Sequence, residues 1–365
     1  LPGYCTARRS QGATERFDFF YNQGSKVGRL KASFTGAFQL EWLDANVDRF
    51  KPVPVEGGFA RLEILPQQGL LIRQSRREGR TSVKALPAQL ESKAGRLDLS
   101  QVDWTMERLK ENAFPLKDWE VCGPKGSLGK IHLPVGPIGL EGVGSGEKAL
   151  LVFRSRFRIF EALKNLRLLV DRHTLEHFDF QVNGRTLAGF KPCRYFDESN
   201  RWASLKGRLV RGVNSLELRS TLDPVVRAPP FKELLYLVGE FEVQRKGAGV
   251  LAPGDRKRAV NGLPEWGTIG WPYFSGRVRY RTEFHAPAAK PCRLEVAYPG
   301  SFARVMLNGL EVGHLYTKPY VLELDGHLKS GRNVLEIEVA NTIENLIEGK
   351  HVASGLRGPV AISYG

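Results

Sequence analysis

The chain has 365 residues, more than one hydrophobic core usually spans, so its length predicts two or three domains. Hydrophobic residues make up 42% and charged residues 25%, no window approaches the roughly 20 apolar residues of a membrane span, and the start, LPGYCTARRS, lacks a signal-peptide pattern. These features predict a soluble globular protein and exclude a membrane-spanning one. Because the chain begins without Met, the sequence leaves open whether it is a processed product or part of a longer polypeptide.

Basic residues exceed acidic ones, 54 to 39, which gives a net charge of +15 and raises the question of a polyanionic partner. They are scattered through strand-like segments, and the densest cluster is GDRKR at 254–258, in a stretch that resembles a linker. We therefore expect no specific nucleic-acid partner and no membrane partner. The four cysteines, at positions 5, 122, 193 and 292, lie far apart without a CxxC pair, which argues against zinc and thioredoxin-like sites and leaves the cellular compartment undecided.

Short alternating runs bounded by Gly, Pro, Asn or Asp recur along the whole chain, whereas helical periodicity is weak. The pattern predicts an all-β protein. In the first 75 residues the expected strands are RFDFFY, GRLKASF, FQLEWL, ARLEIL and GLLIRQ. We place a β-rich N-terminal domain at 1–110.

Two later series of strands are copies of one pattern. FRSRF (153–157) corresponds to YRTEF (280–284), and LRLLV (166–170) corresponds to CRLEV (292–296). DFQVNG (179–184) and LVRGVNSLELR (209–219) have the counterparts RVMLNG (304–309) and LKSGRNVLEIE (328–338) in the same order. The repeat predicts tandem β-sandwich domains at 111–245 and 266–365, joined by a linker at 246–265.

Each copy contains an Asn-Gly pair, Asn183-Gly184 or Asn308-Gly309, between two alternating segments. Asn-Gly is the pair best suited to the two positive φ values of a type I′ hairpin turn. In the following Gly-x-Asn segments, leucines and an isoleucine alternate with Glu217 or Glu336, which predicts a half-buried strand in both copies.

The order FSG, YRTEF, RVMLNGLEVG and KPYVLELDGHLKSGRNVLEIEVANTIENL resembles the galactose-binding-like jelly roll known as the sugar-binding domain of glycoside hydrolase family 2. This domain is also found in bacterial α-L-rhamnosidase-like and β-galactosidase-like proteins. The resemblance covers about residues 140–365, with the first copy more divergent, and residues 1–110 are only loosely similar to the β-rich segments that precede such jelly rolls. It implies tandem galactose-binding-like jelly rolls and an oligo- or polysaccharide partner, while the localisation stays unknown, with a secreted or periplasmic setting left open.

In that family a separate barrel domain carries out hydrolysis, and this chain has neither the length nor the alternating strands and helices for such a barrel. The resemblance therefore implies the non-catalytic, carbohydrate-binding accessory part of a glycoside hydrolase-like protein, with a catalytic barrel domain as partner. The alternative is a structural or protein-interaction module without sugar binding. A complete enzyme of an unfamiliar kind is a third hypothesis.

Sugar binding requires an aromatic face for the C–H side of a ring and planar polar groups for its hydroxyls. The expected carbohydrate-binding candidates are Trp266, Trp271, Tyr273, Tyr316, Asn341 and Asn345 in the second copy and Trp202 in the first. For any one of these aromatics, packing at the end of the sandwich core is the competing interpretation. The stretch RVRYRTEF should be a scaffold strand, with Val278, Tyr280 and Phe284 on one face and the arginines on the other.

No catalytic residue is predicted, because most acidic residues occupy alternating strand positions; Glu265, in the aromatic-rich loop PEWG, is the first suspect. HTLEH at 173–177 has the spacing of a metal-binding histidine pair but lacks the HExxH glutamate, so an ordinary surface role is favoured. No phosphate-binding loop and no G-x-S-x-G motif is present. No cofactor is expected; an oxygen-rich loop could hold a structural calcium ion, although no Asp/Asn cluster nominates one.

Overall fold

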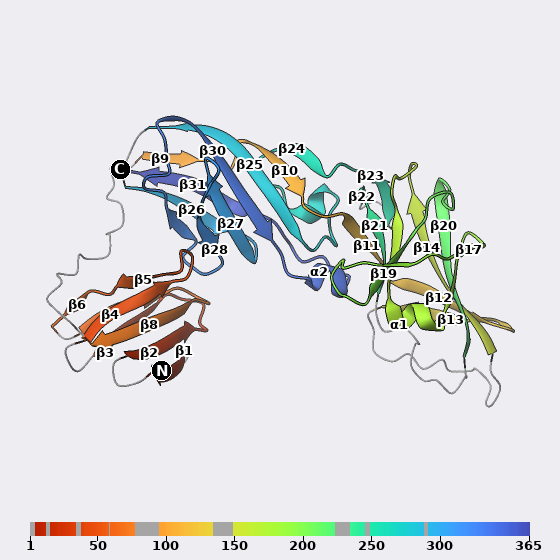
Figure 1. Ribbon diagram of the computed structural model, residues 1–365, viewed down its shortest axis with the longest axis horizontal. Coiled ribbons are helices and arrows are strands. Elements are labelled where there is room, and N and C mark those ends of the chain that lie inside the picture. Colours follow the sequence, from red (N-terminus) through yellow and green to blue (C-terminus); the bar gives the residue numbers. More distant parts are fainter. Residues whose placement is uncertain are drawn as a thin grey trace.

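The computed structural model describes residues 4–11, 15–33, 38–57, 59–76, 95–133, 149–222, 234–244, 249–287 and 291–365. These residues form antiparallel sheets with two short α-helices and one 3-10 helix, which confirms the all-β prediction. Three groups of sheets, which we call the N-terminal unit, the first sandwich and the second sandwich, each surround a hydrophobic cluster of their own. In Figure 1 the first sandwich lies at one end of the molecule, and the N-terminal unit lies beneath the second sandwich at the other end.

The N-terminal unit contains a five-stranded sheet, in the order β1-β2-β8-β4-β5, and a three-stranded sheet, in the order β3-β7-β6. Its strands are β1 (Tyr4–Gln11), β2 (Glu15–Asn22), β3 (Gly28–Ser33), β4 (Phe38–Asp44), β5 (Arg49–Pro52), β6 (Val55–Glu56), β7 (Phe59–Ile64) and β8 (Gly69–Arg76). All five strands expected in this part are present. Their small core includes Leu40, Ile64 and Ile72, which lie on the alternating inward positions.

The first sandwich packs the sheet β11-β21-β15-β19-β18 against the sheet β13-β12-β14-β20-β16-β17, to which β22 and β23 are attached. Its elements are β11 (Asn112–Leu116), β12 (Asp118–Gly123), β13 (Gly126–His132), β14 (Ala149–Ile159), β15 (Arg167–Asp171), α1 (Arg172–His177), β16 (Asp179–Val182), β17 (Arg185–Leu187), β18 (Lys191–Pro192), β19 (Asn200–Ser204), β20 (Gly212–Leu222), β21 (Leu235–Gly239), β22 (Phe241–Gln244) and β23 (Val250–Pro253).

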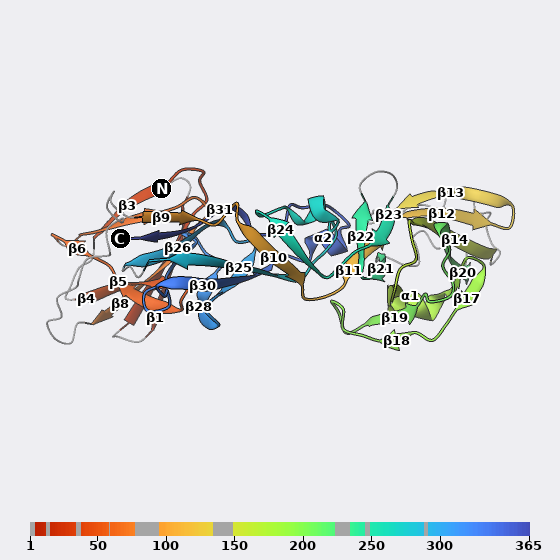
Figure 2. The ribbon, with the colours of Figure 1, turned by 90° about the horizontal axis from the view of Figure 1, so that it is seen from above.

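The second sandwich packs the sheet β24-β10-β25-β30-β27-β28 against the sheet β29-β26-β31-β9. Its elements are β9 (Gly95–Asp98), β10 (Asp103–Arg108), β24 (Lys257–Asn261), η1 (Trp266–Ile269), β25 (Arg277–Ala286), β26 (Cys292–Tyr298), β27 (Phe302–Leu307), β28 (Leu310–Leu315), β29 (Val321–Glu323), β30 (Gly331–Ala340), α2 (Glu344–Ile347) and β31 (Arg357–Tyr364). Figure 2 shows its long strands extending toward the first sandwich.

The sequence repeat corresponds to a repeat of strand order. The central pair β14 and β20 matches β25 and β30, and the adjoining hairpin β16-β17 matches β27-β28. Both hairpins turn at their Asn-Gly pair, with φ values of 50° and 75° for Asn183-Gly184 and of 54° and 81° for Asn308-Gly309. These are the positive values that a type I′ turn requires, so the turn prediction is confirmed.

The asparagine of each Gly-x-Asn segment holds its loop to this turn. The Asn333 amide donates to the carbonyl oxygens of Lys329 and Gly331, and its Oδ1 accepts from Asn308 and from the Lys329 amide. Asn214 makes the equivalent bonds in the first sandwich, including one from Asn183. Both asparagines are fully buried, so the repeated residue is conserved between the two copies for a structural reason.

The second sandwich is discontinuous along the chain, which differs from the expected ranges. Strands β9 and β10 precede the first sandwich in sequence, yet β9 pairs with β31 and β10 pairs with β25. The expected linker contains β24, which pairs with β10. The burial of Trp104 and Met106 explains this grouping: on β10 they alternate with outward-facing residues, and the Trp104 ring packs edge-on against Tyr280 at 6.2 Å.

The predicted alternation of β25 is confirmed. Val278 and Tyr280 are fully buried, while the intervening arginines form ion pairs across the outer face. Arg277 lies 2.7 Å from Glu338, Arg279 lies 3.5 Å from Glu107, and Arg281 lies 3.1 Å from Glu283. The strand is a scaffold element, and its arginines are paired with carboxylates of neighbouring strands and, for Arg281, also of β25 itself. Among the described residues, no helix has the length and apolar character needed to cross a membrane.

Candidate functional site

Trp266 and Trp271, the first two aromatic candidates, belong to the core of the second sandwich. Both have 0% exposure. The Trp266 Nε1 donates to the Tyr280 hydroxyl at 2.6 Å, and the guanidinium groups of Arg108 and Arg258 lie 5.1 and 5.2 Å from the centre of the Trp271 ring. A ring with no exposed surface has no face for a sugar, so the structure corrects this expectation.

Tyr273 and Trp202 are half-buried, and protein groups cover their faces. Tyr273 packs edge-on against Phe114 at 5.8 Å, with the Lys117 ammonium 5.2 Å from its ring centre. The Arg167 guanidinium lies 3.8 Å above the Trp202 ring. Trp202 therefore packs within the first sandwich, and Tyr273 packs against its edge. Neither ring offers an uncovered face for a sugar to stack on.

Asn341 and Asn345 hold together the loops around α2. The Asn341 amide donates to the Phe274 carbonyl oxygen and the Ser354 hydroxyl, and its Oδ1 accepts from the Gly276 amide. Asn345 is 2% exposed. Its side-chain amide donates to the Val352 carbonyl oxygen, and its Oδ1 accepts from the Val352 backbone amide. Their hydrogen-bonding groups are occupied by the protein, so the expectation that they bind sugar hydroxyls is corrected as well.

Glu265 caps the 3-10 helix η1. Its carboxylate accepts hydrogen bonds from the amides of Gly267, Thr268 and Ser354, and His351 lies 3.1 Å away. Burial alone would raise the pKa of Glu265, but these amide bonds and the imidazole hold that pKa below its ordinary value. A general acid needs the opposite shift, so the residue fits a structural cap and not an acid catalyst.

His173 and His177 form an exposed ring pair on α1, with centroids 4.5 Å apart. Within the described part of the chain, no group of three or more His, Cys, Asp or Glu side chains is arranged to hold a metal ion. The histidine pair thus has no third ligand of these types. No cluster of acidic side chains that could bind the expected calcium ion is found among the described residues either.

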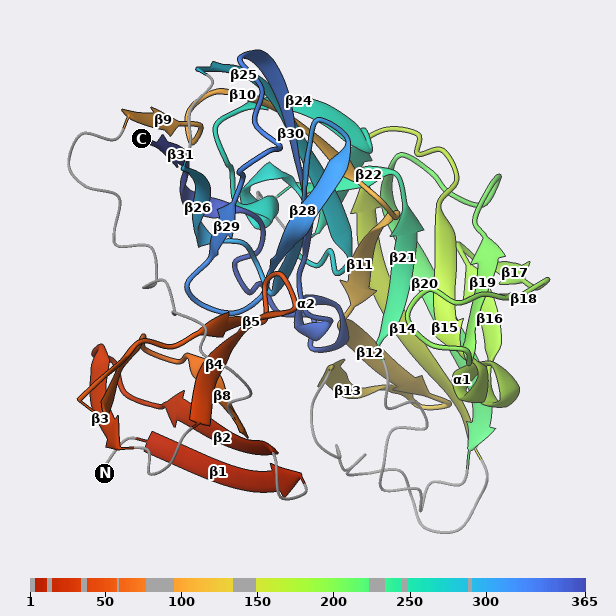
Figure 3. The ribbon, with the colours of Figure 1, turned by 60° about the vertical axis from the view of Figure 1, so that its left-hand side comes forward.

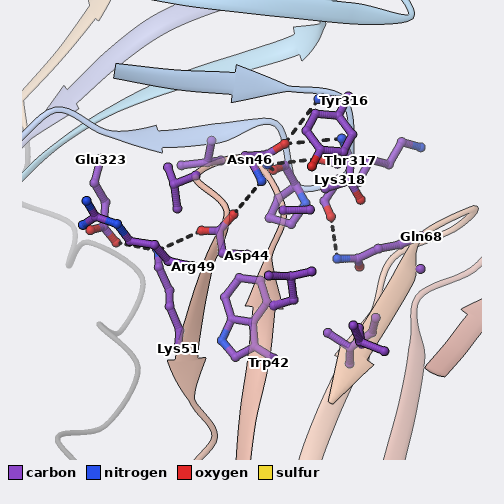
Figure 4. A pocket seen from close by; sticks show the side chains of 18 of the residues that line it. Trp42, Asp44, Asn46, Arg49, Lys51, Gln68, Tyr316, Thr317, Lys318 and Glu323 are labelled. Carbon is purple, nitrogen blue, oxygen red and sulfur yellow. Dashed lines mark hydrogen bonds and ion pairs between the residues drawn. The ribbon is translucent and has the colours of Figure 1, made fainter. Parts of the chain in front are cut away.

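Tyr316, the remaining candidate, lines a pocket of about 970 Å³ between the N-terminal unit and the second sandwich. We call it the junction pocket. The β4-β5 hairpin, the turn before β8 and the connection between β28 and β29 enclose it (Figure 4). Tyr316 stacks on Phe302 at 6.1 Å and is 47% exposed, so part of its ring remains open. Trp42, on β4, provides a second aromatic wall.

Asn46, at the tip of the β4-β5 hairpin, fixes the two walls of the junction pocket together. Its amide donates to the carbonyl oxygens of Thr317 and Pro319, and its Oδ1 accepts from the amides of Tyr316 and Thr317. Its own carbonyl oxygen accepts from His314 at 2.7 Å. Figure 3 shows this hairpin reaching the second sandwich. At 3% exposure, Asn46 satisfies its side-chain polar groups across the junction, while its backbone amide donates to Asp44 within the hairpin.

Lys51 places a positive charge in the same pocket. Its ammonium lies 2.8 Å from Asp44 on the hairpin and 3.3 Å from Glu323 on β29, so it joins the two units (Figure 4). Burial would lower the pKa of Lys51, but the two carboxylates outweigh it and raise that pKa above its ordinary value. The ammonium therefore stays charged.

Within the described part of the chain, several nitrogen atoms around the pocket have no hydrogen-bond or ion-pair partner. Trp42 Nε1 and His327 Nδ1 are buried without a hydrogen bond, and the side chains of Arg49 and Arg293 form no ion pair among the described residues.

The sequence did not single out Trp42, Asn46 or Lys51. The only signal was the alternation of FQLEWL before the hairpin ANVD, since nothing local indicates which distant surface this hairpin meets.

The chain was compared with known proteins, and no family model matches it. Over 95 residues, which is 24% of this chain, it is 30% identical to a protein of Formosa agariphila named "Putative beta-glucuronidase", of which the match covers 8%. Among solved structures it is similar to a rhamnosidase from Novosphingobium sp. PP1Y, with a TM-score of 0.41 and 16% identity over 100% of this chain and 25% of that one.

It is also similar to an α-L-rhamnosidase of Streptomyces avermitilis, with a TM-score of 0.34 and 13% identity over 99% of this chain and 38% of that one. A β-D-mannosidase of Dictyoglomus thermophilum has a TM-score of 0.25 and 15% identity over 63% of this chain and 31% of that one. The proteins that the chain resembles are thus named as glycoside hydrolases, and the chain spans well under half of each of them.

Proposed function

We propose that this chain is a non-catalytic, carbohydrate-binding β-domain region of a glycoside hydrolase-like protein and that it binds saccharide in the junction pocket. The observation that carries the proposal is a pocket of about 970 Å³ with the exposed Tyr316 ring on one wall and Trp42 on the other. Ligand sites commonly have volumes of about 300 to 1,000 Å³ and combine aromatic walls with a few polar groups. The match to a protein named for glucuronidase activity supports a saccharide as the ligand.

The contacts of the acidic residues support a binding role rather than hydrolysis. Asp44 and Glu323 share the Lys51 ammonium, so both act as ion-pair acceptors that hold the two walls together. Glu265 is a helix cap, as described above. The catalytic barrel of such proteins would be a partner of this chain.

The test is a glycan array followed by titration calorimetry on any glycan retained. Replacing Tyr316 with Ala removes the open ring face, so we expect affinity to fall about tenfold, equivalent to about 1.4 kcal/mol. Phe160→Ala is the matched control, because Phe160 has the same 47% exposure but lies on the first sandwich. Retention of no glycan by the wild-type chain would favour the alternative, a structural or interaction module.

A further inference from the structure

We infer that the saccharide taken by the junction pocket is anionic and carries a carboxylate or a sulfate ester. This rests on the proposed function and adds the chemical class of the ligand. The inference depends on which charged and polar groups of the pocket already have partners in the protein and which remain free.

The carboxylates that line the pocket are already paired. Asp44 and Glu323 bind Lys51, and Glu311 lies 3.5 Å from Arg304 and 3.4 Å from His314. Asp325 accepts from the Cys292 amide at 2.8 Å. Each of these four carboxylates thus has at least one partner within the protein, and three of them lie within ion-pair distance of a basic side chain.

The donors differ from the acceptors. Arg49, on β5, and Arg293, on β26, line the pocket from opposite units, and neither side chain has an ion pair or hydrogen bond in the described part of the chain. The Lys318 ammonium donates to the Pro66 carbonyl oxygen at 3.3 Å and has no carboxylate partner among the described residues. By contrast, the arginines on the outer face of β25 each have a carboxylate partner. Among the described residues, the pocket therefore has two unpaired guanidinium groups, one on each of its two units, whereas the arginines of β25 are paired.

Two buried nitrogens on residues that line the pocket have no hydrogen-bond partner in the described part of the chain. Trp42 Nε1 is a donor without an acceptor, and His327 Nδ1 lacks a partner in either tautomer. A buried polar group left unpaired costs about 1 to 3 kcal/mol. Carboxylate and sulfate oxygens accept hydrogen bonds from indole and imidazole and form strong, often bidentate pairs with arginine.

The experiment is affinity electrophoresis of the full chain against two matched pairs of polymers. One pair is polygalacturonate and its carboxyl-reduced form, and the other is carrageenan and its desulfated form. We expect the anionic member of a pair to be bound at least about tenfold more tightly than the neutral member, and the pair that responds identifies the anion as carboxylate or sulfate. Arg49→Gln and Arg293→Gln should each reduce this preference several-fold.

Arg332→Gln is the control for net charge, because Arg332 is exposed and pairs with Glu283 at 2.7 Å outside the pocket. If it weakens binding as much as the pocket variants do, the attraction is non-specific and the inference is overturned. Equal binding of the charged and neutral members overturns the anionic preference and leaves the proposed function intact. If no polymer of either pair is bound, and the glycan array is also blank, the proposed function fails together with the inference.

Discussion

At the scale of single residues, buried polar side chains in this protein differ in how completely they are paired. Asn46 and Asn333 are buried and satisfied on every side. The contacts of the Lys110 ammonium offset the cost of its burial only in part. It donates to the Tyr195 carbonyl oxygen at 3.2 Å and lies 4.0 Å from the centre of the Tyr195 ring. Burial lowers the pKa of Lys110 to about 8, and Glu111 offsets this only in part.

The lowered pKa of Lys110 predicts a definite pH dependence. In the unfolded chain the pKa of this lysine is about 10.4. Between pH 8 and about 10.4 the unfolded state therefore binds more protons than the folded state. The free energy of unfolding then rises with pH, by at most about 1.4 kcal/mol per pH unit. Urea unfolding of the wild type and Lys110→Met should therefore show the wild type gaining stability relative to the variant from pH 7 to pH 10. Lys206→Met, at an exposed site, should show no such change, and a constant wild-type-to-Lys110→Met difference would contradict the prediction.

At the scale of elements, local patterns specified most of what could be predicted. The alternation of β25 and the Asn-Gly turns follow from neighbouring residues alone, because side-chain direction in a strand and φ in a turn are set locally. The burial of Trp266 and Trp271 could not be predicted in this way. An aromatic in a loop has the same sequence signal whether it faces solvent or the core, and here Arg108, far away in the chain, provides part of the packing.

The membership of β10 in the second sandwich gives the prediction at this scale. Trp104 is 1% exposed, donates from Nε1 to the Leu99 carbonyl oxygen and packs against Tyr280. Trp104→Ala should destabilise the second sandwich by about 3 to 5 kcal/mol. Hydrogen exchange should then reveal lost protection in β25 and β30, with β14 and β20 unchanged. Loss of protection confined to the N-terminal unit would contradict this assignment.

At the scale of the whole molecule, the site arises from the meeting of two units, and for that reason the sequence did not reveal it. Trp42 and Tyr316 lie far apart in the chain and become the two walls of one pocket only after the β4-β5 hairpin docks. Tyr316 could be nominated from its own loop, but its partners could not, because residues 1–110 carry no repeat and no motif that indicates where they pack. The internal repeat, in contrast, allowed the fold of both sandwiches to be anticipated.

The docking of the hairpin provides the prediction for the whole molecule. Asn46→Ala removes four side-chain hydrogen bonds to the segment Tyr316–Pro319, so the N-terminal unit should loosen while each unit keeps its own core. We expect faster proteolysis within the β4-β5 hairpin and weaker saccharide binding, with little change in the unfolding of the second sandwich. Asn261→Ala, which removes bonds to Gln101 and Asp103 away from the junction, is the matched control. If Asn46→Ala leaves both the proteolysis rate and the affinity unchanged, the hairpin is not what holds the pocket together, and the binding surface must be formed by one unit alone.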